Sequence, residues 1–208
     1  MPEAIRILIV EDQFFFRLAL HSIVDARTDM TVVGETDKAG AGIELYESCR
    51  PDVTIMDLRL PDMSGVDAIA AIRQRDPKAQ ILVLSNYEGS EDIHRALRAG
   101  ALSYLTKDAS GEELVRAIQT VSLGKRYLTP TVGATLAARV PDANLTDRET
   151  EVLRLLARGC SNREIASRLK IAENTTRIHV SRILDKLAVE DRTQAVLVAI
   201  QKGLVHLD

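Results

Sequence analysis

Short apolar runs alternate with helix-length amphipathic stretches over the first 124 residues of the chain. The clearest runs are residues 7–10, 53–56, 81–84 and 104–106. None of them shows the strict polar alternation of a half-exposed strand, and parallel strands that are buried on both faces have this pattern. Because strand and helix patterns alternate five times, the sequence predicts an α/β domain with a five-stranded parallel sheet.

Residues 145–208 carry helical patterns only. Capping boxes at 146–149 and 161–164 mark two helix starts, and Gly159 is placed to end the first helix. The second helix stops near residues 170–172, a third runs over 173–187, and a fourth over 192–202. Two helices joined by about three residues form a helix-turn-helix, so the sequence predicts an all-α four-helix domain of that type.

Turn-forming residues separate the two patterns, notably Gly124, Pro130, Gly133 and the segment 141–144. We therefore expect a first domain at residues 1–124, a linker at 125–144 with a short helix through 131–139, and a second domain at 145–208. A chain of 208 residues is long enough to give each domain its own core.

The composition is that of a soluble globular protein, with 46% hydrophobic and 27% charged residues. No apolar run approaches the roughly 20 residues that span a bilayer, and no secretory leader precedes the first strand. Cys49 and Cys160 lack the spacing of a disulfide framework or a metal site, which favours a reducing compartment. These features predict a cytoplasmic protein with no membrane partner.

The net charge of -3 is unevenly distributed. Residues 163–186 carry six basic and three acidic side chains, whereas the first domain is acidic overall. Such a basic segment is compatible with a solvated helical surface and with contact to nucleic acid phosphates, and charge alone does not separate the two. The aromatic content of 3% argues against the stacking platforms that bind single strands.

Polar side chains stand where each of the four apolar runs ends: Glu11 and Asp12, Asp57, Ser85, and Lys107. The carboxyl ends of parallel strands meet at one edge of a sheet, so we expect these side chains to share one crevice. Three carboxylates, a hydroxyl and an ammonium suit metal-assisted phosphoryl transfer, with Asp57 as the acceptor. Lys107 and Ser85 would then bind the phosphoryl oxygens through a positive charge and a hydroxyl donor.

Magnesium is the metal that this set of oxygen ligands predicts. Mg²⁺ takes a few carboxylate or carbonyl oxygens and retains several waters. We expect Asp12, Asp57 and the backbone carbonyl of Arg59 to bind it, with Glu11 behind these ligands or bound to the ion through a water.

Residues 5–124 resemble the receiver domain of two-component response regulators. The motifs are the Glu11-Asp12 pair, residues 56–65 (MDLRLPDMSG), Ser85, and residues 104–107 (YLTK). The resemblance implies a flavodoxin-like fold and phosphorylation of Asp57 by the histidine of a sensor kinase. It also implies that Ser85 and Tyr104 form a switch. Asp108 follows Lys107 where many receivers have proline, which leaves the geometry of that peptide bond open.

Helical spacing places Arg177, Ile178 and Ser181 on one side of the third helix of the second domain, opposite its apolar stripe. Arginine can bond guanine in the major groove, isoleucine can contact a thymine methyl group, and serine can bond a base. We expect these three residues to read bases. The residues expected to contact phosphates are Asn162, Arg163, Thr175 and Arg182.

Residues 145–204 resemble the LuxR/NarL-type helix-turn-helix domain, through residues 145–153, 161–166, 179–187 and 191–196. The family implies double-stranded DNA binding through the third helix and a dimer contact through the fourth. Two residues depart from the family pattern. Ala172 stands where a serine usually caps the recognition helix, and Thr176 stands where an apolar valine usually enters the core.

These features together predict a phosphorylation-controlled transcription regulator that acts as a homodimer, and not an enzyme beyond the uptake and loss of its own phosphoryl group. One alternative is an orphan regulator of the same fold that does not use Asp57. Another is a phosphohydrolase with an aspartyl intermediate. The hydrolase is disfavoured because Arg59 stands two residues after Asp57, where a second aspartate would be needed as general acid.

Overall fold

The computed structural model describes residues 3–86, 89–137 and 145–205. The chain forms two compact units, of which the first ends at Ala134 and the second begins at Thr135, with Gly89–Asp92 grouped in the second. Each unit has its own core, and each is described by itself below.

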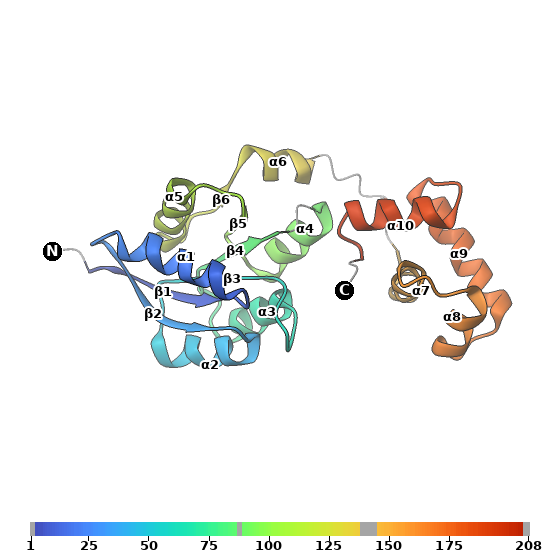
Figure 1. Cartoon of the computed structure of the whole chain (residues 1–208), viewed down its shortest axis with the longest axis horizontal. Coiled ribbons are helices and arrows are strands. Elements are labelled where there is room, and N and C mark those ends of the chain that lie inside the picture. Colours follow the sequence, from blue (N-terminus) through green and yellow to red (C-terminus); the bar gives the residue numbers. More distant parts are fainter. Residues whose placement is uncertain (1–2, 87–88, 138–144, 206–208) are drawn as a thin grey trace. The chain divides into compact units, whose positions relative to one another are not determined.

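The first unit is built on a six-stranded parallel sheet with the strand order β2-β1-β3-β4-β5-β6 (Figure 1). The strands are β1 (Ile5–Val10), β2 (Met30–Thr36), β3 (Val53–Met56), β4 (Ile81–Ser85), β5 (Ser103–Thr106) and β6 (Tyr127–Leu128). The helices along residues 3–137 are α1 (Phe14–Asp25), α2 (Ala39–Cys49), α3 (Gly65–Arg75), α4 (Ser90–Ala99), α5 (Gly111–Ser122) and α6 (Pro130–Ala137).

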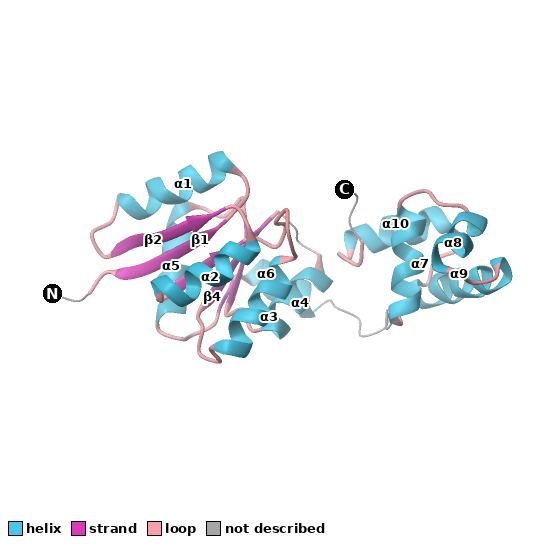
Figure 2. Cartoon of the chain, turned by 90° about the horizontal axis from the view of Figure 1, so that it is seen from below, coloured by secondary structure: helices cyan, strands magenta, loops and turns pink. Residues whose placement is uncertain are grey.

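Helices cover both faces of this sheet, with α1 and α5 on one face and α2 and α3 on the other (Figure 1 and Figure 2). Ile7 and Ile9 of β1 pack in one buried cluster with Val24 of α1 and Ile118 of α5. Every residue of β3 is buried. Burial on both faces explains why the apolar runs in the sequence are continuous, and the predicted α/β fold class is confirmed.

The predicted count of five strands was one too low. The sixth strand, β6, lies inside the segment predicted as a linker and pairs with β5 at Ser103–Tyr127 and Tyr104–Leu128. A strand of two residues is too short to show a hydrophobic period, so pairing with β5 rather than local pattern defines it. The predicted helix at 131–139 corresponds to α6, and residues 138–139 lie outside the described residues.

The second unit consists of α7 (Asp147–Ala157), α8 (Asn162–Leu169), α9 (Glu173–Leu187) and α10 (Arg192–Gln201). Both predicted capping boxes are present, at Thr146 with Glu149 and at Ser161 with Glu164. Gly159 has a φ of 77°, the left-handed backbone with which glycine commonly ends a helix. The four predicted helices of this unit are therefore confirmed.

Two side chains of α7 attach it to the helix-turn-helix formed by α8 and α9. The buried carboxylate of Glu149 accepts a bond of 2.6 Å from Lys186 Nζ and one of 2.8 Å from the Thr146 amide. Although burial favours the neutral acid, these bonds hold the pKa of Glu149 below its ordinary value. Arg148 Nη2 donates to the Leu169 carbonyl at 2.7 Å, where α8 ends. The orientation of α9 therefore depends partly on contacts with α7, which lies outside the helix-turn-helix.

The start of α9 lacks two polar contacts that would stabilise it. Its N-cap residue, Ala172, offers no side-chain acceptor to the first amides. Thr176 is fully buried, and its Oγ1 atom has no hydrogen-bond partner among the described residues, although its amide donates to the Ala172 carbonyl at 3.1 Å. A buried hydroxyl without a partner destabilises a fold by roughly 1–3 kcal/mol.

Thr176→Val is therefore expected to stabilise the second unit, because it replaces the buried hydroxyl with a methyl group of the same shape. We expect a gain of about 1 kcal/mol, or about 4 °C in the melting temperature of this unit. Calorimetry of the full chain measures it, with the half-buried Thr175→Val as the matched control. A lower melting temperature for Thr176→Val would mean that the hydroxyl is satisfied in solution.

Candidate functional site

The side chains predicted to form a site converge at the carboxyl edge of the sheet. Glu11 and Asp12 follow β1, Asp57 follows β3, Ser85 ends β4, and Lys107 follows β5. These four strands are neighbours in the sheet, and backbone bonds continue the pairing beyond them. The Asp57 amide donates to Val10 at 2.9 Å and the Lys107 amide to Ser85 at 3.0 Å.

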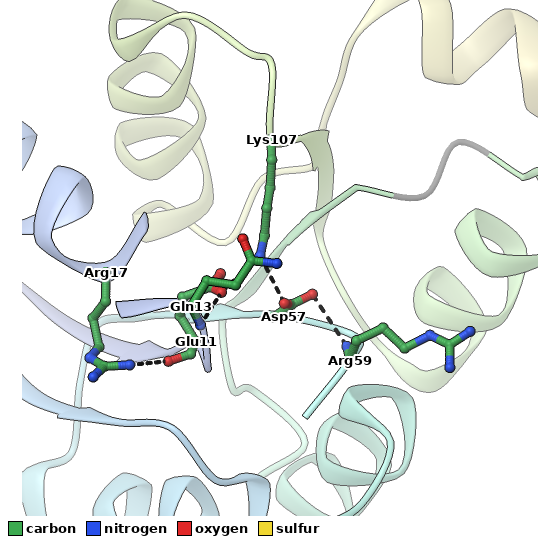
Figure 3. A network of polar contacts seen from close by, with 6 residues as sticks. All are labelled: Glu11, Gln13, Arg17, Asp57, Arg59 and Lys107. Atoms are coloured by element: carbon green, nitrogen blue, oxygen red, sulfur yellow. Dashed lines mark hydrogen bonds and ion pairs between the residues drawn. The ribbon is translucent and has the colours of Figure 1, made fainter. Parts of the chain in front are cut away.

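Lys107 lies at the centre of the site (Figure 3). Its Nζ atom is 2.8 Å from Glu11 Oε1 and 2.9 Å from Asp57 Oδ2. The side chains of all three residues are at most 4% exposed. Ion pairs that are shielded from water interact more strongly than surface pairs, so this lysine holds the two acidic strand ends at a fixed separation.

Glu11 is held by backbone as well as by Lys107. Its carboxylate accepts a 3.0 Å bond from the Gln13 amide, and its carbonyl accepts a 2.5 Å bond from Arg17 Nη1 of α1. Burial, together with the nearby charge of Asp57, raises the pKa of Glu11 above its ordinary value, against the opposing bond from Lys107.

An acidic cluster is formed by Glu11, Asp12 and Asp57, whose nearest carboxylate oxygens all lie within 4.8 Å of one another. Asp12 is exposed, whereas the other two are buried. Oxygen donors that are partly open to water fit the needs of Mg²⁺, which keeps some of its own waters. The Arg59 amide donates to Asp57 Oδ1 at 3.2 Å, and the Arg59 side chain points away from the cluster (Figure 3).

The two predicted switch residues are buried in strands that lead to the site. Ser85 is fully buried at the end of β4, and the ring of Tyr104 is fully buried in β5. None of the described peptide bonds is cis, so the bond between Lys107 and Asp108 is trans.

The second unit presents the residues predicted to read bases on the exposed side of α9. Arg177, Ile178 and Ser181 are exposed, while Ile183 and Leu187 of the same helix are buried in the core. Arg163 and Arg182 are exposed, and Asn162 and Thr175 are partly buried.

Arg177 has a partner that the sequence analysis did not predict. Its Nη2 atom lies 2.8 Å from Glu173 Oε1, one turn earlier on α9. The i,i+4 spacing of opposite charges was the available signal for this pair.

Comparison with known families identifies both units. The family described as "Response regulator receiver domain" matches residues 7–119, and the family described as "Bacterial regulatory proteins, luxR family" matches residues 143–199. The chain belongs to the response regulators of the LuxR family. Neither of the two matched families is an enzyme family.

This response regulator is 36% identical over 207 residues to the response regulator protein VraR of Staphylococcus aureus, across 97% of this chain and 99% of that protein. A LuxR-family two-component response regulator from Aurantimonas sp. SI85-9A1 is 35% identical, with a TM-score of 0.62, over 65% of this chain and 96% of that chain. The response regulator ChrA of a heme-sensing two-component system is 34% identical, with a TM-score of 0.58, over 97% and 98% of the two chains.

These matches confirm the predicted family and function, a phosphorylation-controlled regulator with a receiver and a LuxR-type DNA-binding domain. They do not favour the orphan alternative. No helix within the described residues of this response regulator has the length and apolarity to cross a membrane.

Two further residues lie beside the site of this response regulator, and one of them, Arg17, was missed in the sequence. The Lys107 ammonium lies 4.8 Å from the centre of the Phe16 ring, and Arg17 fixes the carbonyl of Glu11. The signal for Arg17 was a basic residue on the first turn of a helix that follows an acidic pair. For Phe16 the signal was its place in a run of three phenylalanines that follows closely after the acidic pair at 11–12.

Proposed function

We propose that Asp57 of this response regulator accepts a phosphoryl group from the histidine of a sensor kinase, and that the phosphorylated homodimer binds double-stranded DNA to control transcription. The observation that carries the proposal is the buried Lys107 ammonium, 2.9 Å from Asp57 Oδ2. A buried lysine placed on the acceptor carboxylate can bind the oxygens of an incoming phosphoryl group.

The acidic cluster supports a magnesium site. Asp12, Asp57 and the Arg59 carbonyl would hold the ion, and Glu11 would stand behind these ligands or reach the ion through a water. When bound, the metal supplies positive charge that offsets the charge on the transferring oxygens. The side chains of the protein position the reacting groups and stabilise their charge, and phosphoryl transfer depends mainly on these two effects. Asp57 attacks phosphorus while the bond from phosphorus to the histidine nitrogen of the kinase breaks, and the histidine leaves. Lys107 and Ser85 bind the phosphoryl oxygens.

Ser85 and Tyr104 form the proposed switch. Ser85 ends β4, the strand next to the one that Asp57 follows, so its hydroxyl can turn toward a phosphoryl group. The Tyr104 ring occupies a fully buried position, which is the inward position that the switch requires. Phosphorylation would then stabilise this arrangement of β4 and β5.

In this regulator residues 1–124 form the receiver domain, 125–144 the linker and 145–208 the DNA-binding domain. The receiver catalyses only the uptake and loss of its own phosphoryl group, and the protein works in the cytoplasm.

The DNA contacts fall into two sets. Bases are read by Arg177, Ile178 and Ser181, and phosphates are contacted by Asn162, Arg163, Thr175 and Arg182. The exposed position of Arg177, Ile178 and Ser181 on α9 supports the first set.

Arg177→Ala is expected to weaken binding to the specific site by roughly 1–3 kcal/mol and to relax the preference at one base pair, because arginine can bond guanine bidentately. Arg163→Ala should weaken binding to specific and random duplexes alike and reduce the salt slope by about one. Binding titrations on both duplexes at several salt concentrations measure these effects. Equal losses of Arg177→Ala on both duplexes would make Arg177 a phosphate contact.

The functional proposal is tested by linkage between the two domains. If phosphorylation favours the DNA-binding state, specific DNA must favour the phosphorylated state by the same free energy, typically about 1–3 kcal/mol. We expect a duplex selected from a random pool to tighten Mg²⁺-dependent binding of beryllofluoride, a phosphoryl mimic, to the full chain. Scrambled duplex is the control. Specific DNA binding that the mimic leaves unchanged would favour the orphan regulator.

A further inference from the structure

Helix α2 begins without a capping side chain of its own. Its N-cap residue, Lys38, makes no side-chain bond to the first turn. The first amides of a helix have no partner within the helix and need one elsewhere. Asp62, which is distant in sequence, supplies it. Its Oδ1 atom accepts from the Ala39 amide at 2.8 Å, and its Oδ2 atom accepts from the Gly40 amide at 2.8 Å.

Asp62 lies at the tip of the loop that connects the phosphoacceptor strand to α3. The base of this loop is closed by an antiparallel bridge between Arg59 and Ser64 and by a 3.0 Å bond from the Gly65 amide to the Leu58 carbonyl. The loop therefore has two anchors. One is the base beside Asp57, and the other is the bond of Asp62 to α2.

The bond of Asp62 to α2 is strong for a residue on the surface. A carboxylate that accepts two backbone amides at a helix N-terminus gains from charge-assisted hydrogen bonds and from the helix dipole. The bond from Gly40, and after it the bond from Ala39, lowers the pKa of Asp62 against the opposing effect of burial. Glycine at position 40 permits this approach, because an added Cβ atom would lie 3.2 Å from Asp62 Oδ2.

The same loop carries Arg59, whose amide donates to Asp57 Oδ1 and whose carbonyl is the proposed third ligand of Mg²⁺. Rotation of the loop would turn that carbonyl away from Asp12 and Asp57. Some residues orient a metal ligand without binding the metal themselves. Their removal commonly lowers the affinity of the site for the metal.

We propose that Asp62 is a positioning residue of the magnesium site, which holds the Arg59 carbonyl toward the acidic cluster by tethering the loop to α2. This inference rests on the proposed function, because it takes the Arg59 carbonyl as a ligand. Asp62 itself binds no metal in this arrangement. Its effect is transmitted through the backbone of the two residues that separate it from Arg59.

The test is the dissociation constant of Mg²⁺ for the full chain, measured by calorimetry in the wild type and in Asp62→Ala. We expect Asp62→Ala to bind Mg²⁺ about tenfold more weakly, the lower end of the range for the loss of such a supporting residue. Asp62→Asn, which keeps one acceptor oxygen, should give an intermediate loss. Amide hydrogen exchange at Ala39 and Gly40 reports separately on the loss of the helix cap.

Tyr46→Phe is the matched control. The Tyr46 hydroxyl donates to Asp76 Oδ2 at 2.7 Å, and this bond joins the far end of α2 to the residue that ends α3. Its loss should lower stability but leave the Mg²⁺ affinity within about twofold of the wild type, since it does not touch the loop.

Unchanged Mg²⁺ affinity in Asp62→Ala, with faster exchange at Ala39 and Gly40, would overturn the inference and leave Asp62 as a helix cap only. An equal loss of affinity in Tyr46→Phe would also overturn it, because general loosening of α2 would then explain both variants. Failure of the wild type to bind Mg²⁺ would overturn the proposed metal site, and the inference with it. The failures of the two proposals are therefore distinguishable.

Discussion

Asp57→Asn is expected to abolish phosphoryl uptake while the receiver domain keeps its fold. The amide has nearly the shape of the carboxylate and can still accept the bond from the Arg59 amide, which measures 3.2 Å in the wild type. It is neither a nucleophile nor a strong ligand of Mg²⁺. Intact-mass spectrometry after incubation with a small phosphoryl donor and Mg²⁺ measures the uptake, and circular dichroism checks the fold.

Asp67→Asn is the control for that experiment. Asp67 is an exposed acid in the first turn of α3, so the same substitution there should leave phosphoryl uptake unchanged. Stoichiometric labelling of Asp57→Asn would place the acceptor at another residue and would contradict the proposed function.

Lys107→Ala is expected to accept a phosphoryl group without the dimerisation that should follow it. The ammonium is the buried cation that touches both Glu11 and Asp57, so a phosphoryl group on Asp57 would lose its link to β5. Removal also leaves two buried carboxylates without their counter-charge. Breaking a buried ion pair costs on the order of 3 kcal/mol in stability. Chemical unfolding without metal measures that loss, and sedimentation with and without phosphorylation measures dimerisation.

The stability loss in Lys107→Ala should depend on pH in a defined direction. In the wild type the pKa of Glu11 is already raised, so above the ordinary pKa the folded state retains a proton that the unfolded chain releases. The contribution of Glu11 to stability therefore rises as the pH falls toward its ordinary pKa. Loss of Lys107 raises this pKa further, and the recovery of stability on acidification should begin at a higher pH than in the wild type.

Lys125→Ala, at an exposed position outside the site, is the control for these measurements. It should match the wild type in stability, pH response and dimerisation. If Lys107→Ala dimerised normally on phosphorylation, Lys107 would not connect the phosphoryl group to the switch.

The sequence allowed prediction of the site where each residue lies directly at the end of an apolar strand. The buried runs end at or directly before Asp57, Ser85 and Lys107. Because these runs form parallel neighbouring strands, their ends lie at the same edge of the sheet and bring the three residues together. The four helices of the second domain could be predicted equally well, because capping boxes are local signals in the sequence. Local pattern was sufficient in both cases.

Features that depend on contact between distant segments were missed. The strand β6 exists through its pairing with β5, and the cap of α2 is provided by Asp62 from another loop. The sequence near Ala39 contains no sign of that cap. The Thr176 hydroxyl was suspected from a family pattern, yet its lack of a partner follows from the packing of α9 against its neighbours.

The pair between Glu173 and Arg177 bears on how the regulator would search a genome. An exposed pair of this kind is worth only about 0.3–0.5 kcal/mol, well below the roughly 1–3 kcal/mol that a guanine contact can supply. At the correct base, the free energy of the guanine contact would therefore exceed the free energy lost when Arg177 separates from Glu173. On random DNA, the free energy that Arg177 gains from one phosphate contact is closer to that of its ion pair with Glu173. Arg177 therefore remains paired with Glu173 more often on random DNA. The pair would shorten the time spent at wrong sites, and its main effect would be on discrimination rather than on affinity.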